Sequence, residues 1–558
     1  MSSSGAPWLG VYEELGLDWA SLPEVPAKTL SHYVRDHARQ FPDRDAIVFG
    51  GRGTTYRELD GLADRMAQGL VELGLSKGDV LAVHMPNLPQ YVVAFVAAAR
   101  LGVVITSLSP LLRPPELAHQ LDDAGAVAVL TLAPLFPAIE PIAGDRPTLR
   151  RVIVSGPTDL IPGAPDHTSP TVSLGAASVH DFAAILRPTE GPIPDAASLD
   201  DVLYLQYTGG TTGRPKGAQL SSRNLICNNL QVDVFYGYRT GREIVASAFP
   251  FFHIGGAALL LNGLRTASTN ILVPDPRNME AFIGEMKLRP PTVIAAVPAL
   301  YQMLVAQPDF RQVDFSTLRV AVSGGAPFAE AGIAELEEVV GGGRFCEVYG
   351  MTETSPVQTM NPAARLKPGF VGIPVPGTHL RIVDAETGTH TLAANEPGEV
   401  IVSGPQVMRG YAGRPEETAH ALRELDARTW MYTGDIGFMD EEGYLRICDR
   451  AKDMLIVGGY KVFSVEVENK VASRPEVAMC AVVGCPDPER PGNEIVCLYV
   501  QKAPSAPSDD VVAETLASFC RETMAPYKVP KRIEVLEAIP LTSVAKVDKI
   551  ALRERARA

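Results

Sequence analysis

Apolar and polar positions alternate along the first part of the chain in two rhythms. Leucine and methionine recur at helical spacing over residues 59–73, and Thr55 with Glu58 in front of them forms a capping-box pattern, so a helix is predicted there. Strands that alternate with helices predict a parallel sheet covered on both faces. The segments that show this alternation are the strand-like runs 80–85, 103–106 and 126–130 and the helical runs 90–101 and 116–123.

Residues 133–199 are rich in proline, alanine and glycine and have weak periodicity, so we expect a long irregular excursion over the surface. From about residue 377 short runs such as 398–404 indicate a small antiparallel unit, and the charged segment 449–453 separates it from a final mixed region. Between these parts the strand and helix alternation resumes, with strands predicted at 243–249, 270–273, 291–297 and 318–324.

These patterns predict an α/β fold with three parts. The first is a large N-terminal domain of doubly wound sheets, the second a small antiparallel β subdomain, and the third a small α+β C-terminal domain. The length of 558 residues agrees with this reading, because it exceeds what one hydrophobic core accommodates and predicts two to four domains.

Charge and targeting signals narrow the class of protein. A net charge of −15 argues against non-specific nucleic-acid binding, and it means that a polyanionic ligand must be met by local positive charge or by a metal ion. The longest apolar run, residues 91–99, is too short to span a bilayer, and the N-terminus lacks the basic region and apolar core of a signal peptide. A cytoplasmic protein is predicted.

The seven cysteines are scattered and include no Cys-x-x-Cys pair. This pattern favours a reducing compartment and thiols that are structural or idle, rather than a disulfide framework or a zinc site. Cys480 and Cys485 are expected to pack in or near a strand.

The segment 207–218, YTGGTTGRPKGA, directly follows a predicted strand. Its glycines and hydroxyl groups allow backbone N–H groups to close around phosphate oxygens. A Walker-type loop is excluded, because Gly217 stands where that pattern needs Ser or Thr after the lysine. A flexible linker is disfavoured, because linkers seldom combine paired threonines with a single lysine at the end of a strand. We predict phosphate binding by Thr208, Gly209, Gly210, Thr211, Thr212, Gly213 and Lys216.

Further segments carry polar groups suited to a nucleotide. Residues 349–355, YGMTETS, combine an aromatic ring, two threonines and a carboxylate after a predicted strand. Residues 432–440, YTGDIGFMD, place Asp435 in a glycine turn, where it can accept hydrogen bonds from two sugar hydroxyls. Cationic side chains are supplied by Arg450 and Lys452 in DRAKD and by Lys546 in the apolar, turn-prone LTSVAKVDK.

In this order and spacing the motifs resemble those of the AMP-forming acyl-activating superfamily of acyl-CoA synthetases, adenylation domains and luciferases. The resemblance runs from about Thr29 to the C-terminus. Within the superfamily the chain is most similar to bacterial medium- and long-chain fatty acid–CoA ligases, through LQYTGGTTG, IPVPGT, GPQVMRGY, DEEGYLRICDRAKDM and YKVPK. It implies ATP-dependent ligation of such a fatty acid to coenzyme A through an acyl-adenylate, with release of AMP and pyrophosphate.

The resemblance also implies roles for single residues. ATP, Mg²⁺ and coenzyme A are the expected cofactors, with Mg²⁺ bound by Thr208 and Glu353. Tyr349 would stack on adenine, and Asp435 and Arg450 would contact ribose and phosphate. The residues implied in catalysis are Lys546, Glu353, His253 and Thr352. Besides the phosphate loop, the nucleotide and coenzyme A would contact Gly325, Ala326, Pro327, Glu347, Val348, Tyr349, Gly350, Met351, Thr352, Asp435, Arg450, Lys452, Gly458, Gly459, Lys461 and Lys546.

The resemblance further implies a rotation of the C-terminal domain between two half-reactions. Rotation about Lys452 would withdraw Lys546 after adenylation and bring residues 457–461 to the site, where Gly458 and Gly459 let the pantetheine arm pass. The implied parts are an N-terminal ATP- and acyl-binding domain (1–448, with the β subdomain at about 377–448), a hinge (449–453) and a mobile C-terminal domain (454–558).

Several alternatives stay open on the sequence alone. His253 fits a satisfied core histidine as well as a group at the acyl–adenylate junction, and the small residues 255–258 fit tight helix packing as well as an acyl tunnel. Ala545 stands where the superfamily usually has glycine. If that position needs a positive φ, alanine would cost about 1 kcal/mol there and would slow adenylation.

Three rival functions share some of the expected small-molecule partners. The first is ligation of an aryl or cinnamic acid to coenzyme A, the second is transfer of the acyl group to a carrier protein, and the third is a catalytically weak acyl- or nucleotide-binding scaffold. A nucleic-acid partner and a transmembrane segment are not expected, whereas a homodimer and peripheral membrane contact stay open.

Overall fold

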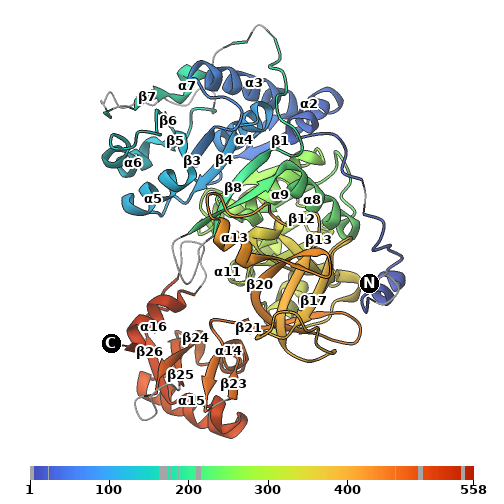
Figure 1. Ribbon diagram of the computed structural model, residues 1–558, viewed down its shortest axis with the longest axis vertical. Coiled ribbons are helices and arrows are strands. Elements are labelled where there is room, and N and C mark those ends of the chain that lie inside the picture. The colour runs from blue at the N-terminus through green and yellow to red at the C-terminus, as the bar shows by residue number, and fades with distance from the viewer. Residues whose placement is uncertain are drawn as a thin grey trace. The chain divides into compact units, whose positions relative to one another are not determined.

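The computed structural model divides the chain into two compact units. It describes residues 6–22, 24–161, 174–175, 177–186, 188–189, 191–208, 215–458, 460–487, 494–541 and 547–557. The first unit comprises Pro215–His379, Ser403–Leu422 and the described part of Met1–Gly209, and the second comprises Leu380–Val402 and the described part of Arg423–Ala558. Figure 1 labels many of the helices and strands of both units.

A seven-stranded sheet in the first unit has the order β7-β6-β5-β3-β4-β8-β9. Its strands run parallel except for β9, which is antiparallel to β8. The strands are β3 (Val80–His84), β4 (Val104–Leu108), β5 (Ala126–Leu132), β6 (Arg151–Ser155), β7 (Ser178–Asp181), β8 (Val202–Thr208) and β9 (Lys216–Ser221). Helices of the same region are α1 (Leu9–Glu14), α2 (Leu30–Gln40), α3 (Tyr56–Glu72), α4 (Pro89–Leu101), α5 (Pro114–Ala124), α6 (Phe136–Ala143) and α7 (Phe182–Ile185).

The predicted helix behind Thr55 and Glu58 is confirmed as α3. The Thr55 side chain accepts a hydrogen bond from the Glu58 backbone N–H, and the Glu58 side chain accepts one from the Thr55 backbone N–H. The expectation of an irregular excursion at 133–199 is wrong, because α6, β6, β7 and α7 lie in it. Proline residues within α6 obscure its period, and β6 presents a fully apolar core of only Val152–Val154.

A nine-stranded sheet, in the order β16-β15-β14-β13-β12-β10-β11-β1-β2, completes the doubly wound part of the first unit. All four strands predicted after residue 200 are present as β10, β11, β12 and β13. The strands are β1 (Asp45–Phe49), β2 (Arg52–Thr55), β10 (Ile244–Ser247), β11 (Thr269–Leu272), β12 (Val293–Ala296), β13 (Val320–Gly324), β14 (Phe345–Gly350), β15 (Val357–Asn361) and β16 (Ile373–Pro374). The remaining helices of the first unit are α8 (Ser222–Tyr236), α9 (Ile254–Arg265), α10 (Met279–Leu288), α11 (Pro298–Val305), α12 (Glu330–Val340) and α13 (Pro415–Ala421).

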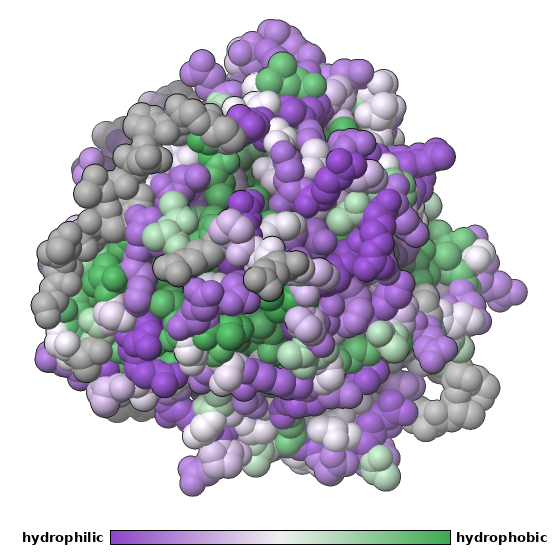
Figure 2. All heavy atoms as spheres, turned by 90° about the horizontal axis from the view of Figure 1, so that it is seen from above, coloured by the Kyte–Doolittle hydropathy of each residue, from purple (hydrophilic) through white to green (hydrophobic). Residues whose placement is uncertain are grey.

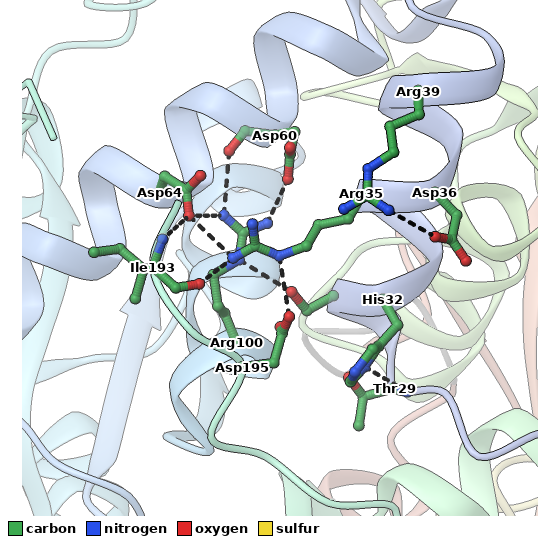
Figure 3. Close-up of polar contacts among 11 residues, drawn as sticks. Thr29, His32, Arg35, Asp36, Arg39, Asp60, Asp64, Arg100, Ile193 and Asp195 are labelled. Carbon is green, nitrogen blue, oxygen red and sulfur yellow. Dashed lines mark hydrogen bonds and ion pairs between the residues drawn. The ribbon is translucent and has the colours of Figure 1, made fainter. Parts of the chain in front are cut away.

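Helices α2, α3 and α4 are joined by a buried ion network (Figure 3). Arg100 on α4 is fully buried and lies 2.6 Å from Asp60 and 2.5 Å from Asp64, both on α3. Arg35 on α2 lies 3.2 Å from the same Asp64 and 3.0 Å from Asp195. Asp64 also accepts a hydrogen bond from the backbone N–H of Ile193. The network therefore fastens the connection that leads to β8 onto the helices beside the sheet.

The second unit begins with an antiparallel sheet in the order β17-β18-β20-β19, with β21 paired to β20. This confirms the antiparallel unit predicted from about residue 377. Its strands are β17 (His379–Val383), β18 (Gly398–Ser403), β19 (Leu422–Leu425), β20 (Arg428–Met439) and β21 (Leu445–Arg450). The rest of the unit is α+β, with β22 (Leu455–Val457), β23 (Tyr460–Val462), α14 (Ser464–Ala472), β24 (Val477–Pro486), β25 (Glu494–Lys502), α15 (Asp509–Thr523), β26 (Arg532–Leu536) and α16 (Lys549–Arg557).

One expectation about the cysteines is wrong. Cys485 and Cys497 form a disulfide between β24 and β25, so they are not idle thiols. The two strands pair Cys485 with Ile495 and Val483 with Cys497, which places the cysteines diagonally, with their Cα atoms 6.2 Å apart. The sequence does not reveal this register. Cys480 packs in β24, as expected for a cysteine near a strand.

In the part of the chain that the structure describes, no helix combines the length and the apolar character that crossing a membrane requires. Figure 2 shows hydrophilic and hydrophobic residues interspersed on one face of the molecule. The large apolar side chains that are exposed, such as Leu111, Leu288 and Tyr460, come from separate segments of the chain. Single exposed apolar residues of this kind are normal on a protein surface.

Candidate active site

The hairpin of β8 and β9 forms the base of the predicted phosphate loop. Thr208 ends β8, Lys216 begins β9, and the two residues face each other in the antiparallel register. The Thr208 hydroxyl lies 3.5 Å from the Lys216 carbonyl oxygen. The structure therefore brings together the two ends of the loop. The loop residues Gly209, Gly210, Thr211, Thr212 and Gly213 lie outside the described residues.

The predicted metal ligand Glu353 lies in a short 3-10 turn, Thr352–Thr354, that follows β14 and packs against β8 and β9. Its side chain is buried. The hydroxyl of Tyr411 donates a hydrogen bond of 2.7 Å to Glu353 Oε1, and the Lys216 ammonium lies 4.6 Å from the centre of the Tyr411 ring. Glu353 and Lys216, predicted from distant motifs, thus meet at one tyrosine that sequence reasoning did not single out.

The predicted adenine wall is built at the carboxyl ends of two neighbouring parallel strands. β13 and β14 pair with Gly324 opposite Val348, so residues 325–327 leave the sheet beside residues 349–351. Gly325 has φ +84°, a left-handed conformation that favours glycine where the chain turns away from β13. Ligands of open α/β sheets bind at this edge. The structure therefore gathers Gly325, Ala326, Pro327, Val348, Tyr349, Gly350 and Met351 at one sheet edge.

Glu347 lies on β14, two residues before Tyr349 and therefore just inside the same edge of the sheet. It is buried and accepts a hydrogen bond of 3.3 Å from the Phe328 backbone N–H. Burial raises the pKa of Glu347 to about 7, and the Phe328 hydrogen bond opposes this rise. Its carboxyl group consequently changes charge near neutral pH.

His253 caps the N-terminus of α9, where its Nδ1 accepts a hydrogen bond of 3.1 Å from the Gly255 backbone N–H. The Gln206 side chain donates to the carbonyl oxygen of Phe252, which ties this turn to β8. A Cβ on Gly256 would lie 2.2 Å from the Pro250 carbonyl oxygen, so close backbone packing explains that glycine. For Gly256 this favours the packing alternative over the tunnel.

Within the second unit, Asp435 and Arg450 are directly opposite each other on β20 and β21. Arg450 Nε lies 3.1 Å from Asp435 Oδ1, and Asp435 is buried while Arg450 is partly exposed. Asp435 lies inside strand β20 rather than in the predicted turn, and the left-handed Gly434 (φ 69°) before it also belongs to the strand. Desolvation and the nearby Arg450 charge lower the pKa of Lys452 to about 8.

The predicted coenzyme A residues fall on a hairpin of the second unit. Gly458, with φ 59°, follows β22, and Lys461 lies on β23. Lys461 lines a cavity of about 260 Å³ together with Ile436, Met454 and Phe463. Gly459, Ala545 and the predicted catalytic Lys546 lie outside the described residues.

Tyr411 is the site residue that sequence reasoning missed. It closes the segment GPQVMRGY, which contributed to the family resemblance without any role for its tyrosine. Tyr411 and Glu353 are 58 positions apart in the sequence, so no local sequence pattern predicts their contact. The available signal was weaker: an aromatic residue with a polar tip, which usually finds a partner when buried.

Comparison with known proteins shows the family of the chain. The family model "AMP-binding enzyme" matches residues 34–412, and "AMP-binding enzyme C-terminal domain" matches residues 466–546. The chain is 35% identical to a long-chain-fatty-acid–CoA ligase of Bacillus subtilis (strain 168), covering 99% of this chain and 98% of that protein. It is 33% identical to a feruloyl-CoA synthase of Amycolatopsis sp, covering 93% and 97%.

Among solved structures, an anthranilate CoA ligase in complex with anthranoyl-AMP superposes with a TM-score of 0.84 at 25% identity, covering 97% of this chain and 99% of that one. The chain belongs to the family of AMP-binding enzymes. The resemblance inferred from the motifs and the α/β fold class are both confirmed.

Proposed function

We propose that the protein is an ATP- and Mg²⁺-dependent ligase that joins a medium- or long-chain fatty acid to coenzyme A. An acyl-adenylate is the intermediate, and AMP and pyrophosphate are released. The meeting of Lys216 and Glu353 at Tyr411 carries the proposal, because it sets a cation and a carboxylate at the base of a phosphate loop. The relatives named as fatty-acid ligases, at about one-third identity over nearly the whole chain, support the choice of acid.

The first half-reaction brings a carboxylate to a polyphosphate, so like charges must be neutralised and held in place. Thr208 and Lys216 stand at the loop ends of the two hairpin strands and would hold the β- and γ-phosphates through the hydroxyl and the ammonium group. Glu353 is a buried carboxylate fixed in one orientation, and with Thr208 it offers the oxygen donors that Mg²⁺ prefers. Bound there, Mg²⁺ would neutralise phosphate charge.

The nucleotide's other parts would be held by residues that the proposal takes from the sequence. Tyr349 and residues 325–327 would enclose adenine, with Glu347 behind them. Asp435 would accept hydrogen bonds from the ribose hydroxyls, and Arg450 would meet phosphate. His253, Thr352 and Lys546 would surround the reacting carboxylate and the α-phosphate.

The second half-reaction would use residues 454–558 as a mobile domain that turns about Lys452 in the hinge 449–453. This domain division is part of the proposal. The turn would withdraw Lys546 and bring the hairpin that carries Gly458, Gly459 and Lys461 to the acyl-adenylate, along which the pantetheine arm would pass. Because ATP and coenzyme A are cytoplasmic metabolites, we place the reaction in the cytoplasm.

Replacing Lys546 tests the division of labour. Lys546→Ala is expected to abolish acyl-AMP formation, measured as pyrophosphate release, and to spare thioester formation from supplied acyl-AMP and coenzyme A. Lys531→Ala, at an exposed lysine of the same unit, is the matched control and should leave both steps unchanged. Equal loss in both half-reactions of the Lys546 variant would contradict the rotation scheme.

An aryl acid is the second candidate substrate, since the feruloyl-CoA synthase and the anthranilate CoA ligase are also similar to this chain. Pyrophosphate release with a panel of aliphatic acids and aromatic acids separates the two. Turnover with C8 to C18 acids supports the fatty acid, and turnover confined to benzoic or cinnamic acids replaces it. Thioester formation with a carrier protein but not with coenzyme A would favour the carrier rival, and no pyrophosphate release with any acid would favour a scaffold.

A further inference from the structure

Tyr411 joins three segments that are far apart in the sequence. Its hydroxyl reaches Glu353 in the turn after β14, and its ring lies under the ammonium of Lys216 at the start of β9. All three residues belong to the first unit, and both Tyr411 and Glu353 are buried. The tyrosine thus contacts the proposed metal ligand through one end and the proposed phosphate-binding lysine through its face.

The backbone around Tyr411 is fixed to β9 like an additional strand. Gln219 N–H donates to the Gly410 carbonyl at 2.9 Å, Arg409 N–H donates to the Gln219 carbonyl at 3.0 Å, and Ala412 N–H donates to the Gly217 carbonyl at 2.9 Å. The neighbouring Met408 N–H donates to the carbonyl of Glu353 itself, at 2.8 Å. Residues 408–412 therefore hold the phosphate-loop strand and the Glu353 turn at the same time.

The Tyr411 phenol is an uncharged donor to the Glu353 carboxylate. Its hydroxyl donates the 2.7 Å hydrogen bond to Glu353 Oε1, and the side chain is buried at this contact. A neutral donor fixes the direction of a carboxylate without neutralising it, whereas a cation in the same place would compete with a metal ion.

The ring acts on Lys216 in a corresponding way. A cation over an aromatic face is attracted by the ring's quadrupole yet keeps its full charge. The distance of 4.6 Å from ammonium to ring centre lies within the range of this interaction. Both groups are consequently contacted by one uncharged side chain.

We propose that Tyr411 is a positioning residue for adenylation, which aims the Glu353 carboxylate at Mg²⁺ and holds the Lys216 ammonium toward the phosphates of the same ATP. This inference rests on the proposed function, because it takes Glu353 as a metal ligand. It predicts that loss of the hydroxyl affects the half-reaction that uses Mg²⁺·ATP and not the half-reaction that starts from acyl-AMP.

Tyr411→Phe isolates the hydroxyl, because the ring under Lys216 stays. We expect the Mg²⁺ concentration for half-maximal pyrophosphate release to rise about tenfold or more, the size expected when a hydrogen bond to a charged group is lost. The rate of thioester formation from supplied acyl-AMP should stay within about twofold of the wild-type rate. Tyr56→Phe is the matched control, since Tyr56 is buried and donates to the Ser268 carbonyl away from the site. A Tyr411→Phe variant with an unchanged Mg²⁺ requirement, or with equal loss in both half-reactions, overturns the positioning role.

A double-mutant cycle separates failure of this inference from failure of the proposed function. In a Glu353→Gln background, Tyr411→Phe should have no further effect on adenylation, because the carboxylate through which it acts is gone. Additive losses would overturn the inference while leaving the metal role of Glu353 in place. A Glu353→Gln enzyme with wild-type adenylation and Mg²⁺ requirement would overturn that metal role, and the inference with it.

Discussion

Two buried carboxylates of the first unit are treated in opposite ways. Asp64 lies among helices α2, α3 and α4, where the guanidinium groups of Arg35 and Arg100 approach it directly (Figure 3). Glu353 lies beside the phosphate-loop hairpin, where the neutral phenol of Tyr411 holds it and the nearby Lys216 rests on the phenol ring. A carboxylate that holds the fold is neutralised within the fold, whereas one proposed to bind a metal is oriented by an uncharged donor.

The difference follows from what each group must do. A buried charge that stays buried needs a counter-charge, because desolvation otherwise costs several kcal/mol. A carboxylate that receives Mg²⁺ must keep its negative charge until the ligand arrives, and a protein cation bonded to it would have to be displaced first. The comparison predicts that substitutions in the helix network act on stability and substitutions at the site act on ATP-dependent chemistry.

The largest expected effect tests the helix network. Arg100→Met should lower the free energy of unfolding by about 3–5 kcal/mol, because it leaves the buried Asp64 with one cation fewer and removes the ion pair of the partly buried Asp60. Urea denaturation measures the loss, and pyrophosphate release per folded molecule should be unchanged. Arg277→Met is the control, since Arg277 pairs with Asp275 at the surface, and it should leave the free energy of unfolding nearly unchanged. Equal costs for the two variants would remove the distinction between buried network and surface pair.

A smaller effect is expected at Glu347, the other buried carboxylate of the site. Its pKa is about 7 in the folded protein against 4.5 for an ordinary glutamate, so the native state keeps a proton that the unfolded state has lost between these values. Stability must therefore fall as pH rises from about 4.5 to 7. Glu347→Gln removes this dependence and should be more stable than wild type by up to about 3 kcal/mol above pH 7, with no difference below pH 4.

Thermal unfolding of wild type and Glu347→Gln over a range of pH measures this dependence of stability on pH. The control is Glu335→Gln, a change at an exposed carboxylate on α12, which should shift stability equally little at every pH. A stability difference between Glu347→Gln and wild type that does not vary with pH would contradict the burial argument.

The smallest effect concerns Asp435, which stands between the two cases because it has an ion-pair partner and a proposed ligand. Asp435→Asn should change the free energy of unfolding by less than about 1 kcal/mol, since Arg450 is partly exposed. The KM for ATP should rise about tenfold through weaker hydrogen bonds to the ribose. Asp426→Asn breaks a similar pair with Arg381 in the same unit and should leave the KM unchanged. A larger loss of stability than of ATP affinity would place Asp435 with the structural carboxylates.

What the sequence predicts well is what neighbouring residues determine. The capping box of Thr55 and Glu58 is a contact over three positions, and the structure contains it. The strands predicted after residue 200 are also present. Each of them is an apolar run bounded by turn residues, which is a signal that neighbouring residues supply. Strand β6 escaped notice, because Val152–Val154 is too short a run to stand out from its proline-rich surroundings.

Contacts set by the fold were out of reach of local patterns. Tyr411 reaches Glu353 only because residues 408–412 lie along β9, and Cys485 meets Cys497 only through the register of β24 and β25. The family resemblance implied ligand-binding roles for Lys216, Glu353, Asp435 and Arg450, and these roles stay predictions, although Arg450 does pair with Asp435 and Lys216 does lie over the ring of Tyr411. The resemblance gave no role to Tyr411, which lies between Lys216 and Glu353, because only roles that a family motif already carries can be transferred to this chain.

Thr208 and Lys216 are paired residues of the β8–β9 ladder. Because of this pairing, the stability of the fold depends little on the length of the predicted phosphate loop between them. Because the ladder already holds the two ends together, lengthening the chain between them adds only the entropy of a larger closed ring, about 0.6 kcal/mol for each doubling. The number of residues in the loop is therefore free of any requirement from the sheet. In the proposed function, what limits that number is the size of the phosphate chain that the loop would surround.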